Sequence, residues 1–317
     1  SDYDLRPGDV TELKRLFEHA TTFGSLIQVP EELAEKLPAL KQLSEATSQD
    51  LFVSEALKRL EPLVQQAELL AAQYDAVVAN PPYMGRNGME GPLKQFTKSD
   101  FPDAKGDLFA CFIERGYSLA KERGLNSMVT MQNWMFLSSF QKMRERLLSK
   151  NTLKTLTQIG FNSFPTLNSK FALAAVYSLS TNRITGFVSS FIDLNSAPHA
   201  ADKKAVFLER DEANSYQLSA SEFKRIPGSP VAYRASTAVL NVFSTHTPIK
   251  DVLPVRVGMS TGDTPRFVRL WHEVDRQSFG PACENRESAT DSPCRWFPYN
   301  KGGAVRKWYG NNEYVVL

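Results

Sequence analysis

The sequence predicts an α/β fold, a sheet covered by helices, followed by a second region of mixed α+β structure. From Tyr74 to Leu179, short apolar runs alternate with segments of helical periodicity. Residues 1–73 show helical spacing only, and from residue 251 onward proline, glycine and aromatic residues replace the helical patterns. A length of 317 residues is also typical of two domains.

The N-terminal segment, residues 1–73, is expected to be helical and to pack on the sheet or form an insertion beside it. Asp9 to His19 reads as a short helix with Asp9 as its N-cap. Residues 30–46 and 48–73 have helical spacing. An apolar stripe for core packing is formed by Leu51, Ala56, Leu57, Leu60, Leu63, Leu69 and Leu70.

The alternating segment, residues 74–180, is expected to form the sheet. Its first strand, residues 75–79, is short and rich in valine, which is typical of a central, buried strand of a parallel sheet. The elements that follow are predicted as helix 107–121, strand 126–131, helix 138–150, strand 153–160 and strand 171–180. Residues 181–250 read as a connector, and residues 251–317 as the start of the mixed region.

Composition is ordinary for a soluble globular protein, with 42% hydrophobic and 23% charged residues. No run of 18 apolar residues and no signal peptide is present, so no membrane role is indicated and a cytoplasmic location is expected. Cys111, Cys283 and Cys294 form no C-x-x-C pair, which predicts reduced thiols and no metal site.

The tetrapeptide Asn80-Pro81-Pro82-Tyr83 directly follows the first predicted strand. Ligands of open α/β sheets bind beyond the carboxyl ends of the strands, where Asn80 would lie. The two prolines stiffen the loop and remove two N–H donors, so the loop presents acceptors: the Asn80 side-chain carbonyl and the Pro81 backbone carbonyl. Tyr83 adds an aromatic face on which a planar substrate can stack.

These groups suit methylation of an amino group conjugated to a ring or a carbonyl. The lone pair of such a nitrogen is delocalised, which makes it a poor nucleophile. Two acceptors that hold its hydrogens favour the pyramidal geometry of the transition state more than the ground state. The loop could also be an ordinary turn with Tyr83 in the core, but four specified residues directly after such a strand favour the functional interpretation.

The tetrapeptide resembles the catalytic motif of adenine-specific DNA methyltransferases. The similarity to this family continues, in the same order and spacing, through Lys105 to Gly116, Gly124 to Trp134, Phe161 to Thr166 and Phe171 to Leu179. Gly258 to Trp271 and Trp296 to Asn312 look like the PglX-type methyltransferases of BREX phage-defence systems, which are related to type IIG restriction–modification enzymes. Residues 181–253 are covered only loosely.

The resemblance implies a Rossmann-like class I methyltransferase sheet, followed by the beginning of a target-recognition region at 251–317. It implies S-adenosylmethionine as cofactor and double-stranded DNA and other defence-system proteins as partners. The adenine would be flipped out of the duplex, its amino group held by Asn80 and the Pro81 carbonyl. Tyr83 would stack on the base, with Phe164 as the second contact, and Asp107 and Phe109 would border the cofactor. Asp107 reads equally well as a helix N-cap.

One departure from the family concerns the cofactor. The family's Gly-rich turn and following acidic residue precede the catalytic loop, but Gly8 and Gly24 in residues 1–73 form no Gly-x-Gly turn. We therefore expect an incomplete sheet that lacks its N-terminal cofactor-binding strands, in a fragment from the middle of a larger protein that binds the cofactor poorly alone. The pair Gly258 and Gly262 is spaced by four residues, which favours a turn or a DNA-facing loop over a permuted cofactor motif.

A net charge of +2 is too small to indicate nucleic-acid binding, so the distribution of charge matters. Near the C-terminus, Lys301, Arg306 and Lys307 alternate with aromatic residues, which suits contact with the DNA backbone. A β-rich packing layer with exposed basic residues is equally compatible. Basic residues also follow one predicted helix and its exit, as a solvated or a phosphate-facing row: Lys142, Arg144, Arg146, Lys150 and Lys154.

Two other functions remain open. Protein-glutamine methyltransferases use the same tetrapeptide, because a glutamine amide presents a similar amino group, but residues 181–317 argue against this smaller class. Alternatively, the chain acts only as a DNA-binding or assembly part of a defence complex.

Overall fold

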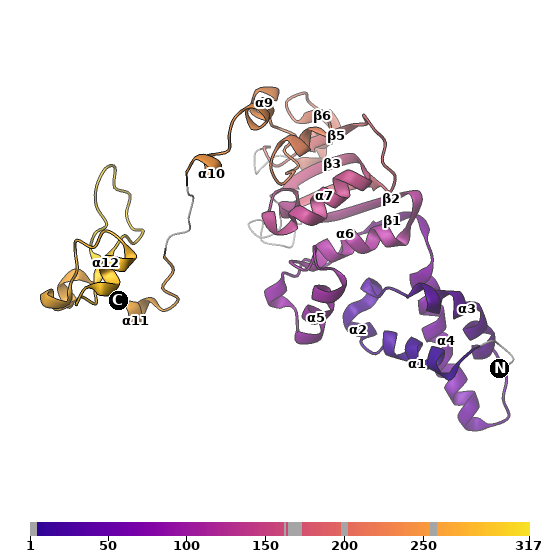
Figure 1. The fold of residues 1–317 in the computed structure, drawn as a ribbon. Helices are drawn as coiled ribbons and strands as arrows, with labels where there is room; N and C mark the ends of the chain where they lie inside the picture. The colour runs from indigo at the N-terminus through magenta and orange to yellow at the C-terminus, as the bar shows by residue number, and fades with distance from the viewer. Residues whose placement is uncertain (1–4, 162, 164–172, 198–201, 254–258) are drawn as a thin grey trace. The chain divides into compact units, whose positions relative to one another are not determined.

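The computed structural model describes residues 5–161, 163, 173–197, 202–253 and 259–317 (Figure 1). The chain divides into two compact units, Ser1–Thr247 and Pro248–Leu317. The first unit contains a helical segment and a six-stranded sheet, and the second a three-stranded sheet.

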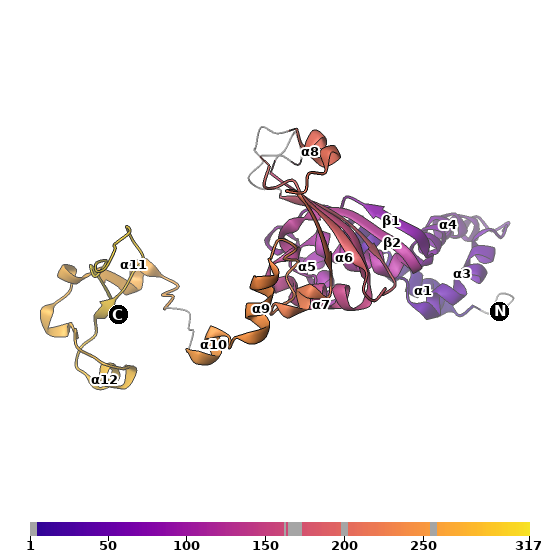
Figure 2. The ribbon, with the colours of Figure 1, turned by 90° about the horizontal axis from the view of Figure 1, so that it is seen from above.

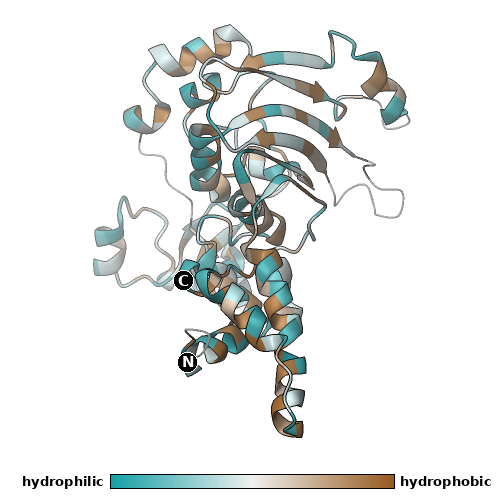
Figure 3. Cartoon of the chain, turned by 90° about the vertical axis from the view of Figure 1, so that its right-hand side faces the viewer, coloured by the Kyte–Doolittle hydropathy of each residue, from teal (hydrophilic) through white to brown (hydrophobic). Residues whose placement is uncertain are grey.

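The helical segment has its own hydrophobic core. Its helices are α1 (Pro7–Leu16), α2 (Ala20–Phe23), α3 (Glu31–Ser44) and α4 (Leu51–Ala71). The alternation of hydrophobic and hydrophilic positions along them is visible in Figure 3. Of the predicted apolar stripe, Leu60 lies in this core and Leu63 and Leu70 pack against it, whereas Leu51 and Leu69 are exposed.

Asp9 is not the N-cap of α1, contrary to the sequence prediction. The N-cap is Arg6, because the helix begins earlier, at Pro7, whose missing N–H is no loss in the first turn. Asp9 lies in that first turn, and its carboxylate accepts a hydrogen bond of 2.8 Å from the Arg6 N–H. The acidic side chain therefore still stabilises the N-terminal end of the helix, but from inside it.

The sheet of the first unit has the strand order β1-β2-β4-β3-β5-β6. Strands β1 and β2 are parallel, β4 is antiparallel to both of its neighbours, β3 and β5 are parallel, and β6 is antiparallel to β5. The carboxyl ends of β1, β2, β3 and β5 consequently lie together at one end of the sheet. The strands are β1 (Tyr74–Ala79), β2 (Ala120–Met131), β3 (Thr152–Gly160), β4 (Ala174–Ser180), β5 (Val188–Asp193) and β6 (Ser215–Ser219).

Helices α5 (Gly91–Asp100), α6 (Leu108–Leu119) and α7 (Gln141–Lys150) contribute to the core on one face of the sheet (Figure 2). Gly116 allows α6 to approach β2 closely, because a Cβ at this position would lie 2.6 Å from Nδ2 of Asn126. The predicted α/β class, a sheet covered by helices, is thereby confirmed.

Two sequence expectations about the sheet are wrong. Residues 181–250 are not merely a connector, because β5 pairs with the free edge of β3 and β6 with β5. Strand β1 is not central but forms an edge of the sheet in this chain, and Val78 is 79% exposed. An apolar run shows that a strand can be buried on both faces, but its neighbours decide whether it is.

Arg115 joins the helical segment to the sheet. It is 4% exposed and donates hydrogen bonds from α6 to the carbonyls of Ser25, at 2.9 Å, and Leu70, at 2.8 Å. Phe23 also stacks on Phe96 of α5, with ring centroids 4.1 Å apart.

The remaining α-helices described in this unit are α8 (Lys203–Glu209) and α9 (Thr237–Thr245).

The second unit is built around a small antiparallel sheet in the order β7-β9-β8. Its strands are β7 (Val268–Leu270), β8 (Phe297–Tyr299) and β9 (Tyr314–Val316), and its short helices are α10 (Ile249–Val252), α11 (Thr264–Phe267) and α12 (Arg286–Asp291). Strands and short helices thus occur together here, as the mixed composition of this region predicts.

Candidate active site

The loop Asn80 to Tyr83 leaves the carboxyl end of β1, as the sequence predicts. Asn80 is exposed, Pro81 is buried and Pro82 is exposed, so the loop is fixed by Pro81 while Asn80 faces solvent. The Tyr83 hydroxyl donates a long hydrogen bond of 3.4 Å to Oδ1 of Asn80. A weak bond of this length can give way to a stronger donor, such as an amino group, that approaches the same oxygen.

The chain following this loop is paired with the residues that begin α6. The Leu108 N–H donates to the Met84 carbonyl at 3.1 Å, and the Arg86 N–H donates to the Gly106 carbonyl at 3.1 Å. Gly85 forms an antiparallel bridge with Asp107. These contacts fix the position of the tetrapeptide Asn80 to Tyr83 relative to α6, although Met84 and Asp107 are 23 positions apart in the sequence.

Asp107 occupies the N-cap position of α6, and its carboxylate also anchors the loop. Its Oδ1 accepts a hydrogen bond of 3.0 Å from the Met84 N–H. Burial raises the pKa of the Asp107 carboxyl, against the lowering effect of the N–H groups of Met84, Phe109 and Leu108. Burial therefore disfavours the charged form of this carboxyl more than the neighbouring N–H groups favour it.

Replacing Asp107 by alanine is expected to lower the free energy of unfolding by about 1 kcal/mol, the net value of one hydrogen bond. The loss stays small because the variant also removes a half-buried charge. Asp107→Asn keeps an oxygen acceptor for Met84 without the charge and should be at least as stable as the original protein. Urea unfolding of the three proteins tests this, and equal instability of both variants would contradict it.

Tyr83 packs against the core of the sheet rather than standing free in the loop. Its ring lies edge-on to Phe109, with centroids 6.3 Å apart and an interplanar angle of 88°. Phe109 in turn contacts Phe140 at 5.8 Å. Burial raises the pKa of Tyr83 to about 12, so the hydroxyl remains protonated near neutral pH and can donate.

Phe109 does not present its ring to a ligand in this structure. The side chain is completely buried, at 0% exposure, in the core beneath Tyr83. The structure thus gives Phe109 a supporting contact to Tyr83, whereas the predicted cofactor contact would require its ring to be uncovered. Asp107, which is half-buried, keeps an accessible position at the start of α6.

A polar network lies at the end of the sheet where β2 and β3 finish. The sequence analysis did not predict it. Gln158, at the end of β3, donates to Oε1 of Gln132, just after β2, at 2.9 Å, and accepts from the Tyr233 hydroxyl at 2.5 Å. Asn133 has a buried Oδ1 without a hydrogen-bond partner among the described residues. Polar residues at the carboxyl ends of successive strands were the signal that could have indicated this network.

Three of the remaining predicted residues lie in the second unit, and one lies outside the described residues. Lys301 is half-buried, with Nζ 4.5 Å from the ring centroid of Tyr314. Arg306 and Lys307 are exposed. Phe164 is among the residues that the structure does not describe, so its role as a base contact stays a prediction.

The basic row on α7 is neither a uniformly solvated nor a uniformly phosphate-facing surface. Arg144 is 1% exposed and lies in the protein interior. Arg146 forms ion pairs with Asp103, at 2.9 Å, and with Glu114. These two arginines have structural partners within the first unit, which the spacing of basic residues alone could not reveal.

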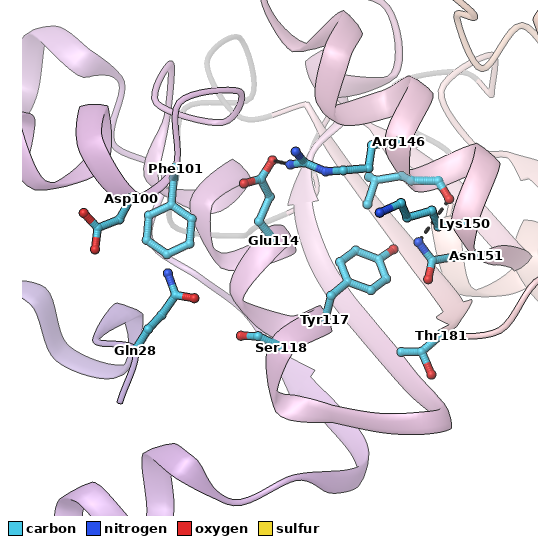
Figure 4. Close-up of a pocket in the computed structure, with 11 residues that line it drawn as sticks. Gln28, Asp100, Phe101, Glu114, Tyr117, Ser118, Arg146, Lys150, Asn151 and Thr181 are labelled. Atoms are coloured by element: carbon cyan, nitrogen blue, oxygen red, sulfur yellow. Dashed lines mark hydrogen bonds and ion pairs between the residues drawn. The ribbon is translucent and has the colours of Figure 1, made fainter. Parts of the chain in front are cut away.

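A cavity of about 490 Å³ lies at the end of the sheet where β1, β2, β3 and β5 begin, opposite the loop that follows β1 (Figure 4). It includes Tyr117 at the end of α6, Lys150 at the end of α7 and Thr181 after β4. None of the predicted site residues lines it. The Tyr117 hydroxyl, whose pKa is raised by burial, has no hydrogen-bond partner among the described residues.

Within the described ranges, no group of three or more His, Cys, Asp or Glu residues could hold a metal ion. The same residues include no helix long and apolar enough to cross a membrane.

The chain is similar to known DNA-modifying enzymes. Residues 14–164 match the family model of the Eco57I restriction-modification methylase. The adenine-specific methyltransferase BrxX of Escherichia coli O9:H4 (strain HS) is 40% identical over 303 residues, which are 95% of this chain and 24% of that protein. The adenine-specific methyltransferase PglX of Lacticaseibacillus casei (strain Zhang) is 35% identical over 263 residues, 81% of this chain and 22% of that protein.

Solved structures are more distant. The methyltransferase subunit of a type I restriction-modification system from Streptococcus thermophilus is 14% identical, with a TM-score of 0.39 over 73% of this chain and 58% of that chain. A TM-score of this size supports no inference about function.

By its family match over residues 14–164, on the α/β sheet described above, the chain resembles the methylases of restriction–modification systems. More specifically, the chain is homologous to one segment of the PglX-type adenine-specific methyltransferases, and the family resemblance inferred from the sequence is confirmed. The chain spans about a quarter of the length of these curated relatives.

Proposed function

We propose that the protein transfers a methyl group from S-adenosylmethionine to the exocyclic amino group of a flipped-out adenine in DNA, as part of phage defence or restriction–modification. The observation that carries the proposal is the exposed Asn80 at the carboxyl end of β1, in a loop held against α6. The names of the relatives, adenine-specific methyltransferases, support adenine as the target.

Asn80, Pro81 and Tyr83 each have a part in this reaction, and Pro82 stiffens the loop between them. Oδ1 of Asn80 and the carbonyl of Pro81 accept hydrogen bonds from the two amino hydrogens and hold the nitrogen in line for attack. As the nitrogen becomes pyramidal, its hydrogens become more acidic and both bonds strengthen, which lowers the barrier. The Tyr83 ring, held edge-on by Phe109, stacks on the base after it leaves the duplex.

S-adenosylmethionine, when bound, supplies the electrophilic methyl group. Of the two residues predicted to border it, Asp107 fits, because its carboxylate is half-exposed beside the loop. Phe109 does not fit a contact with the cofactor in this structure, because its ring is buried. Phe164 is proposed as the second base contact, and Lys301, Arg306 and Lys307 as contacts to the DNA backbone. Other proteins of the defence system are proposed as further partners.

The test uses the full-length protein with isotopically labelled S-adenosylmethionine. Labelled methyl groups should appear as N6-methyladenine in duplex DNA, and single-molecule sequencing of host DNA with and without the gene should locate them. Label on a glutamine of a protein substrate, with none on DNA, would support the protein-glutamine alternative instead. DNA binding without any methyl transfer would support a non-catalytic role.

A further inference from the structure

The loop between β8 and β9 forms a long hairpin in the second unit. The two strands pair antiparallel, with Tyr299 opposite Tyr314, so residues 300–313 connect them (Figure 1). Nδ2 of Asn311 donates to the Ala304 carbonyl at 3.2 Å and closes the loop below its tip. Residues 305–310 therefore form the tip of this loop.

The tip exposes three large apolar side chains. Val305 is 99% exposed, Trp308 is 89% exposed and Tyr309 is 84% exposed. Trp308 has the ammonium group of Lys307 5.6 Å from its ring centroid. Two adjacent aromatic rings that are almost fully open to solvent leave a large apolar area uncovered, which is typical of a binding surface.

The charge around these rings is positive. Residues 300–313 contain Lys301, Arg306 and Lys307, and Glu313 at the base of the hairpin is their only acidic residue. Lys301 lies over the Tyr314 ring at the base, whereas Arg306 and Lys307 are exposed at the tip beside Trp308. Aromatic faces flanked by cations and without acidic neighbours complement bases flanked by phosphates.

We propose that this hairpin tip binds DNA by stacking Trp308 and Tyr309 on bases, while Arg306 and Lys307 contact the phosphates on either side. The inference rests on the proposed function, in which DNA is the substrate. Bulky side chains at the tip of a protruding loop can enter between the base steps of DNA. The tip then makes base contacts as well as the backbone contacts expected from the sequence.

The test measures the affinity of the full-length protein for a fluorescent duplex by anisotropy at several salt concentrations. Stacking is insensitive to salt, whereas the removal of one phosphate contact reduces the slope of log affinity against log salt by about 0.9. The double variant Trp308→Ala/Tyr309→Ala should bind about 10-fold or more weakly with an unchanged slope. The variant Arg306→Gln/Lys307→Gln should reduce the slope by about 1 to 2.

Trp271→Ala is the matched control, because Trp271 is an exposed tryptophan, 56% exposed, of the same unit but outside the tip. It should bind like the original protein. The proposal is overturned if the aromatic double variant binds the duplex as tightly as the original protein, or if it binds more weakly with an altered salt slope. It is also overturned if the original protein does not bind the duplex. Methyl transfer to DNA is measured separately. If the protein methylates DNA but its DNA affinity does not depend on the tip, only this inference is wrong. If DNA affinity depends on the tip but no methyl group is transferred, only the proposed function is wrong.

Discussion

Replacing Asn80 by alanine is expected to lower kcat for adenine methylation about 100- to 1,000-fold, the usual effect of removing one preorganised hydrogen-bonding group from a transition state. Asn80 offers the exposed side-chain acceptor of the loop, and its partner, the Pro81 carbonyl, cannot replace it. The effect should fall on kcat more than on DNA affinity, because the bond strengthens only as the nitrogen becomes pyramidal. Single-turnover methylation and DNA binding measure the two quantities.

Two controls separate a loss of catalysis from a loss of stability or of the Tyr83 hydroxyl. Because Asn80 is exposed, the alanine variant should keep the free energy of unfolding within about 0.5 kcal/mol. Tyr83→Phe removes only the hydroxyl that donates the long 3.4 Å bond to Asn80 and keeps the ring, so its activity should remain within about tenfold. Full activity in Asn80→Ala would exclude the catalytic role of Asn80.

Replacing Arg144 by alanine is expected to lower the free energy of unfolding of the first unit by about 3–5 kcal/mol, as when one partner of a buried charged group is removed. The Arg144 guanidinium donates to the carbonyls of Trp134 at 2.8 Å, Leu137 at 3.0 Å, Ser229 at 2.9 Å and Gly228 at 3.1 Å. Burial lowers the pKa of this guanidinium, but it stays charged. Alanine would remove this donor from the carbonyls of Trp134, Ser229 and Gly228, whereas Leu137 keeps the Phe140 N–H. A buried carbonyl left unpaired costs about 1–3 kcal/mol.

Chemical denaturation of Arg144→Ala and Lys142→Ala provides the comparison. Lys142 is an exposed cation on the same helix, so its variant should change the free energy of unfolding by no more than about 0.5 kcal/mol. Arg144→Lys should recover little, because one ammonium group cannot reach both loops that the planar guanidinium joins. Equal stability of the two alanine variants would show that Arg144 does not hold these loops together.

The local sequence determined most of the elements that precede and follow the loop Asn80 to Tyr83. Apolar runs and helical spacing were sufficient for β1, α6, α7 and β3, whose bounds are close to the predicted ones, whereas β2 begins at Ala120, well before the predicted start at residue 126. The tetrapeptide from Asn80 to Tyr83 could be assigned to the end of β1 because proline chemistry and strand pattern both act within a few residues. The family resemblance rested on the same short-range signals.

Tertiary structure decided what depends on partners distant in sequence. Whether β1 is central or at an edge, and whether residues 181–250 only connect or add β5 and β6 to the sheet, depends on strand pairing that no local pattern encodes. Arg144 and Phe109 were read as a surface cation and a cofactor contact, yet both are buried, because neighbouring segments cover them. The sequence by itself placed the loop Asn80 to Tyr83 directly after a strand and predicted its chemistry, whereas the anchoring of that loop by Asp107 and Phe109 follows only from the packing of α6 against it.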